Sequence, residues 1–179
     1  MEDAAAQGVS TVVVHLPADG YPLRPLGLER RRSLVALSED RGVQLAFENL
    51  RNLRNLALVL ETFPSRCVGF CYDSRHHRNY AAGQDLLAQY GRRLMAVHLH
   101  DNGGVHNQHQ LPLDGDIDWA EVMLRLARTG YQGATSLEPM NWDYGQLTIR
   151  QFLSLAQEKA SALDRMRATA KAQHLRSRA

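Results

Sequence analysis

Apolar runs of strand length alternate along this chain with longer segments in which apolar residues recur at helical spacing. Runs rich in β-branched and other apolar residues are predicted to be strands at 11–15, 43–47, 68–72, 94–97 and 133–137. Helices are predicted at 28–40, 53–62, 81–90 and 119–128, the last of these capped by Asp118, and a final helix from about residue 148 towards residue 170. Strands that alternate with helices predict an α/β fold built on a parallel sheet with right-handed crossovers.

The two faces of the predicted strands differ in character, and the difference separates the two architectures that this alternation allows. Ala46, Ala96 and Ala134 stand on one face of their strands, whereas bulky residues such as Phe47 and Val97 stand on the other. A small, polar inner face and an apolar outer face covered by helices favour a (β/α) TIM barrel over an open doubly wound sheet. The sequence therefore predicts a TIM barrel.

The predicted strands are too few for a closed barrel. Such a barrel has eight strands and about 250 residues, whereas this chain has 179 residues and five predicted strands. We therefore expect an incomplete barrel that lacks its N-terminal units, with residues 4–8 as the end of a helix. Either the chain is a fragment of a longer protein or another copy completes the sheet, and the two open edges predict a homo-oligomer.

Composition indicates one ordinary globular domain over 1–179, which ends in a helix and a basic tail at about 150–179. Hydrophobic residues make up 44% and charged residues 22% of the chain, and the net charge of +2 is too small to favour nucleic acid or an anionic membrane as a partner. Cys67 and Cys71 do not form the framework of a secreted domain, and no apolar run reaches the ~20 residues of a membrane span. We expect a cytoplasmic protein with reduced thiols.

Acidic and imidazole side chains directly follow four of the predicted strands. Glu48 follows 43–47, Asp73 follows 68–72, Glu138 follows 133–137, and His98-Leu99-His100 follows 94–97. Because the carboxyl ends of parallel strands meet at one edge, we expect these side chains to lie together, with His98 and His100 on one face. Carboxylates and imidazoles at four strand ends predict a divalent-metal site.

Further motifs accompany these strand ends in a fixed order. They are Val14-His15, Glu48-Asn49, Asp73-Ser74-Arg75-His76, His98-Leu99-His100-Asp101-Asn102, Asp116-Ile117-Asp118-Trp119, Gly130-Tyr131-Gln132-Gly133 and Leu137-Glu138-Pro139. Together they resemble the xylose isomerase-like barrel superfamily, from Val9 to about Trp142 and over its later strands. That superfamily contains sugar and sugar-phosphate isomerases and epimerases, inosose-processing enzymes and zinc endonucleases that act at abasic DNA sites.

The resemblance implies a divalent metal ion held by Glu48, Asp73, Glu138 and one histidine of the pair His98 and His100. The ion would be Mn²⁺, Mg²⁺, Co²⁺ or Zn²⁺, because mixed carboxylate and imidazole ligands suit all four. It also implies an enzyme, a sugar or sugar-phosphate isomerase or epimerase in which Glu48 and Glu138 remove and return a proton beside a carbonyl. Residues expected to contact the small sugar substrate are His15, His76, His106 and Trp142.

For some of these residues the sequence is equally consistent with a structural role. His15 could be a hydrogen-bonded histidine at a strand end, and Trp142 could pack against the protein rather than against substrate. His106 stands where some sugar epimerases carry an arginine, which leaves the far end of the substrate undefined. Asp101 and Asn102 are expected to form a turn.

Two other functions compete with the isomerase. A truncated barrel could keep its ligands, lack activity and serve as a binding or assembly module. The endonuclease branch of the superfamily uses more metal ligands, and His15, His76 and His109 stand where these would be expected. Asn107, however, stands where that branch has a carboxylate, so DNA repair is the least favoured of the three functions.

Overall fold

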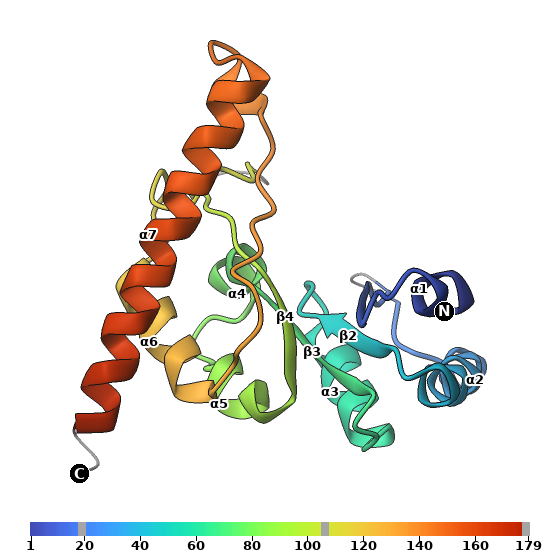
Figure 1. Ribbon diagram of the computed structural model, residues 1–179. Coiled ribbons are helices and arrows are strands. Elements are labelled where there is room, and N and C mark those ends of the chain that lie inside the picture. The colour runs from blue at the N-terminus through green and yellow to red at the C-terminus, as the bar shows by residue number, and fades with distance from the viewer. Residues whose placement is uncertain (18–20, 105–107, 177–179) are drawn as a thin grey trace.

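The computed structural model describes residues 1–17, 21–104 and 108–176, whose elements are arranged as shown in Figure 1. The strands are β1 (Thr11–Val14), β2 (Gln44–Glu48), β3 (Val68–Asp73) and β4 (Leu94–His98). The α-helices are α1 (Glu2–Ala6), α2 (Pro25–Arg41), α3 (Leu53–Thr62), α4 (Ser74–Tyr80), α5 (Leu86–Tyr90), α6 (Trp119–Thr129) and α7 (Ile149–Arg176). Two short 3₁₀ helices, η1 (Gly91–Arg93) and η2 (Trp142–Tyr144), complete the described elements.

The four strands form one parallel sheet in the order β1-β2-β3-β4, with helices in the crossovers. The register places Glu48 beside Cys71 and Asp73 beside His98, so the carboxyl ends of β2, β3 and β4 come together. This open wall of parallel strands is an incomplete (β/α) TIM barrel, and the predicted fold class is confirmed (Figure 1).

The strand predicted at 133–137 is wrong as a regular strand. Its only pairing within the described residues is a parallel bridge between Leu137 and Leu99, made by Leu99 N–H to the Ser136 carbonyl at 2.9 Å and by Glu138 N–H to the Leu99 carbonyl at 3.1 Å. The preceding residues, Gly-Ala-Thr-Ser, have little apolar surface to bury, and β4 contacts them along only this short stretch. The bridge nevertheless brings Glu138 to the end of β4.

The helices follow the prediction except around residues 74–90. One helix was predicted at 81–90, whereas the structure has α4 before this segment and only α5 within it. The cause lies in the caps: the Asp73 side chain accepts the N–H of His76, and the Asp85 side chain accepts the N–H of Ala88, so each starts a helix of its own. The Asp118 cap of α6 is confirmed, because its side chain accepts the N–H of Glu121 at 3.0 Å.

The core lies between the outer face of the sheet and the helices. Leu45, Phe47, Val97 and Leu99 are fully buried there with apolar residues of α3, α5 and α6, as the alternation along the strands predicted. Removing each such side chain from water contributes about 1.5–3 kcal/mol. No described helix has both the length and the apolar character that a membrane span requires.

Candidate metal centre

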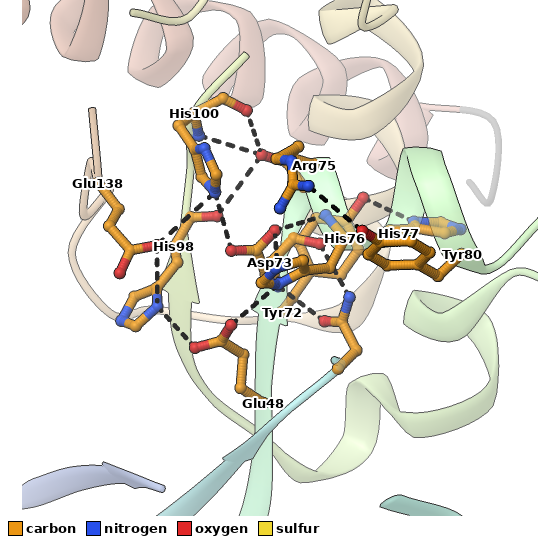
Figure 2. A network of polar contacts seen from close by, with 12 residues as sticks. Glu48, Tyr72, Asp73, Arg75, His76, His77, Tyr80, His98, His100 and Glu138 are labelled. Carbon is orange, nitrogen blue, oxygen red and sulfur yellow. Dashed lines mark hydrogen bonds and ion pairs between the residues drawn. The ribbon is translucent and has the colours of Figure 1, made fainter. Parts of the chain in front are cut away.

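The candidate centre is built where β2, β3 and β4 end. Glu48, Asp73 and His98 are the last residues of these strands, and His100 follows two residues later on the same face. The bridge between Leu99 and Leu137 adds Glu138 from the other side. Figure 2 shows these side chains converging from four segments of the chain, as the sequence predicted.

Glu48 has three imidazole neighbours, and its side chain is buried. Its Oε2 atom lies 3.0 Å from His98 Nδ1 and 3.2 Å from His15 Nε2, and its Oε1 atom lies 3.0 Å from His76 Nδ1. His76 reaches this position because it lies in the first turn of α4, directly above the end of β3. Histidines from three different segments of the chain therefore surround one carboxylate.

Asp73 is fully buried and joins two of the histidines. Its Oδ2 atom accepts a hydrogen bond from His100 Nε2 at 2.9 Å. Its Oδ1 atom accepts the backbone N–H of His76 at 2.6 Å and lies 3.3 Å from His76 Nδ1. One side chain thus caps α4 and also faces the centre.

Glu138 is more exposed than the other two carboxylates and stands at the mouth of the centre. Its Oε2 atom lies 3.6 Å from both His98 Nδ1 and His100 Nε2, and 4.0 Å from His109 Nδ1. The His109 ring stacks on that of His100, with centroids 4.1 Å apart and 11° between the planes. His109 was considered only as an extra ligand of the endonuclease type, but here it lies beside Glu138.

The carboxylates and imidazoles of the centre shift one another's pKa values towards the charged forms of Glu48, Asp73 and His76. Burial alone would raise the pKa of Glu48, but the close imidazoles of His76 and His98 outweigh it and lower that pKa to about 2. Burial is likewise outweighed at Asp73, whose pKa is held well below its usual range by His100 and His76. Burial alone would lower the pKa of His76, but the close carboxylates of Asp73 and Glu48 outweigh it and raise that pKa to about 9. Both carboxylates are therefore ionised at neutral pH.

The donor set fits a divalent cation. In each of the trios Asp73–His98–Glu138, Glu48–Asp73–His76 and His100–His109–Glu138, one potential ligand atom per residue lies within 4.8 Å of the others. The Nδ1 atoms of His76, His98 and His100 are buried, and no hydrogen-bond partner is aligned with them among the described residues. Anionic oxygens and imidazole nitrogens grouped in this way suit Mn²⁺, Co²⁺ and Zn²⁺, and a carboxylate-rich subset also suits Mg²⁺.

The residues predicted to contact substrate lie around this centre, with one outside the described residues. His15 is largely exposed and reaches Glu48, while Trp142 is exposed and meets the edge of the His109 ring at a centroid distance of 5.9 Å. His76, in contrast, is wedged between two carboxylates. His106 lies outside the described residues, as does Asn107.

A family model that describes the xylose isomerase-like TIM barrel matches residues 1–168. The chain belongs to this family. It is 33% identical to the uncharacterised protein y4fM of Sinorhizobium fredii, over 90% of this chain and 60% of that protein. It is 26% identical to the uncharacterised protein MJ1311 of Methanocaldococcus jannaschii, over 74% of this chain and 50% of that protein. The chain thus spans between half and three fifths of these curated relatives.

Solved structures share the fold of this xylose isomerase-like chain at low sequence identity. A D-tagatose 3-epimerase-like protein matches 96% of the chain with a TM-score of 0.71 and 22% identity, and the match covers 67% of that protein. An L-ribulose 3-epimerase matches 98% of the chain with a TM-score of 0.70 and 16% identity, covering 67% of that protein. The IolI protein with a bound zinc atom matches 96% of the chain with a TM-score of 0.67 and 20% identity, covering 66% of that protein.

Proposed function

We propose that the chain carries the metal-binding and catalytic part of a sugar or sugar-phosphate isomerase or epimerase. The carrying observation is that Glu48 and Glu138 reach the same nitrogen, His98 Nδ1, at 3.0 and 3.6 Å from different segments of the chain. Two carboxylates that approach one point from different directions can remove a proton beside a carbonyl and return it. The names of the similar solved structures, two of them sugar epimerases, support the same class of substrate.

The burial of the ligands suggests how the roles divide. Asp73, which also caps α4, would act as a ligand, together with Glu48, Glu138 and His98 or His100. A divalent ion bound there supplies positive charge that polarises a carbonyl oxygen. Glu138 stands partly exposed at the mouth and can meet substrate, so it shares the proton transfer with Glu48. His15 and Trp142, which are exposed beside the centre, would contact the hydroxyls or the ring face of the sugar, and His76, held between Glu48 and Asp73, would contact a hydroxyl.

The test combines metal content with turnover. We expect about one divalent ion per chain by elemental analysis and turnover of small ketoses in the presence of Mn²⁺ or Co²⁺. Glu138→Gln keeps the shape of the side chain but removes its charge, and it should lower turnover roughly 100-fold or more. Glu158→Gln on the exposed face of α7 is the matched control and should leave turnover unchanged.

Other outcomes separate the alternatives. Metal binding without turnover of any ketose would identify a binding module. Incision of abasic DNA would identify the endonuclease, which is favoured by one observation, namely that His15, His76 and His109 also reach the carboxylates of the centre. A wild-type protein that holds no divalent ion and cannot be loaded would overturn the proposal.

A further inference from the structure

Asn49 directly follows Glu48, and Ser74 directly follows Asp73. Each of the two side chains forms two hydrogen bonds with the backbone of a residue of the centre on the neighbouring segment. The Asn49 side chain accepts the N–H of Asp73 at 2.7 Å and donates to the Asp73 carbonyl at 3.0 Å. The Ser74 hydroxyl accepts the N–H of His100 at 3.1 Å and donates to the His100 carbonyl at 2.7 Å. Both side chains are at most 1% exposed.

These bonds begin where the regular pairing of the strands stops. The last pair between β2 and β3 is Glu48 with Cys71, and the last pair between β3 and β4 is Asp73 with His98. Asp73 lies two residues beyond Cys71, and it is held by Asn49. His100 lies two residues beyond His98, and it is held by Ser74. A carboxamide and a hydroxyl can each donate and accept, so each side chain replaces one further step of backbone pairing.

We propose that Asn49 and Ser74 are positioning residues that set the spacing of Glu48, Asp73 and His100 before any ion binds. The inference rests on the proposed function, since it concerns the same metal centre. Glu48 precedes Asn49 in the chain and Asp73 precedes Ser74, so the two sets of bonds link three ligands in series. Neutral side chains achieve this without adding charge beside two ionised carboxylates. An ion then meets ligands whose backbone is already in place, and less ordering opposes binding.

The chain offers a matched control for each residue. Asn55 is also a buried asparagine, and its side chain forms hydrogen bonds with backbone groups of Leu23, Pro17 and Tyr21 rather than with a residue of the centre. Ser38 is also a buried serine, and its hydroxyl donates to the Val43 carbonyl. Replacing either control removes comparable backbone bonds elsewhere in the fold, so a purely structural role would give all four variants similar effects.

The experiment titrates the purified full chain with Co²⁺ and follows the visible absorption of the bound ion. We expect Asn49→Ala and Ser74→Ala to weaken Co²⁺ binding about 10- to 100-fold, as loss of groups that orient ligands does. Ser74→Thr keeps the hydroxyl and should bind nearly as the wild type does. Asn55→Ala and Ser38→Ala should lower stability but leave Co²⁺ affinity within about twofold.

A second measurement does not depend on the ion. Hydrogen exchange at the amide of Asp73 should accelerate in Asn49→Ala, and exchange at His100 should accelerate in Ser74→Ala. If Asn49→Ala does not fold, Asn49→Ser is used instead, because its side chain stays neutral and polar but is too short to keep both bonds to Asp73. Wild-type Co²⁺ affinity in folded Asn49→Ala and Ser74→Ala would overturn the inference alone. Failure of the wild-type chain to bind Co²⁺ would overturn the proposed function and this inference with it.

Discussion

At the scale of single residues, the centre is a set of histidines in close contact with a smaller set of carboxylates. His76 illustrates the balance, because its Nδ1 atom lies 3.0 Å from Glu48 Oε1 and 3.3 Å from Asp73 Oδ1. Asp101 has a different role nearby. Its carboxylate accepts hydrogen bonds from Trp119 Nε1 at 2.6 Å and from the N–H of Ile117 at 3.1 Å, so it fixes the loop before α6. Asp101 does not form the turn expected of it, because it pairs with Gln110 in an antiparallel bridge and its side chain anchors a buried indole.

The raised pKa of His76 predicts a pH dependence of stability in EDTA-treated protein. Despite burial, Asp73 and Glu48 raise this pKa to about 9 in the folded state, whereas the unfolded value is about 6.5. The imidazolium therefore contributes stability that is fully present below about pH 6.5 and is lost as the pH rises through about 9. Urea denaturation should show the free energy of unfolding falling across this range.

The control for this prediction is His76→Gln, which cannot titrate. Its free energy of unfolding should fall less between about pH 6.5 and about pH 9 than that of the wild type. Parallel curves for the two proteins would contradict the assignment of the pH dependence to His76.

At the scale of elements, one arginine joins three segments at the amino-terminal ends of the strands. The Arg93 guanidinium, in η1, donates to the carbonyls of Phe63 at 2.7 Å and Val68 at 2.6 Å, and also to that of Leu60. Two of these carbonyls belong to the C-terminal end of α3, where the last backbone carbonyls lack partners within the helix. Arg93 therefore links α3 to the start of β3. Because it directly precedes Leu94, the first residue of β4, it links both of them to β4 as well.

Replacing this arginine should loosen all three elements together. Arg93→Met keeps much of the side-chain volume but removes every donor, and several charge-assisted hydrogen bonds disappear. We expect the free energy of unfolding to fall by about 2–4 kcal/mol in urea denaturation. Arg92→Met is the control, because Arg92 is exposed and precedes Arg93 directly, and it should change stability by less than about 0.5 kcal/mol. Equal effects of the two substitutions would contradict this role of Arg93.

At the scale of the whole molecule, the sheet is an open part of a barrel wall. Among the described strands, β1 pairs with β2 on one side and with no strand on the other. The match to the solved barrels covers 64% to 67% of most of those chains, which agrees with an incomplete wall. An unpaired edge of this kind is a template for pairing with another chain.

Self-association through this edge is the prediction at this scale. Multi-angle light scattering after size exclusion should give a mass above that of one chain, and the mass should rise with protein concentration because pairing follows mass action. Moderate urea, below the unfolding midpoint, serves as a control that should shift the mass towards the monomer. A concentration-independent monomer would contradict the prediction.

The sequence by itself determined four of the strand runs, their apolar outer face and the carboxylates and imidazoles at their carboxyl ends, because alternation and strand polarity are local properties. It also determined α3, at 53–62, and the Asp118 cap of α6, because helical spacing and capping act within one or two turns. Only the tertiary structure decided that 133–137 pairs through a single bridge and that His109 stacks on His100. The bonds from Asn49 and Ser74 belong to the same group. They join residues 24 and 26 positions apart in the sequence, and such contacts depend on the register between strands, which no local pattern contains.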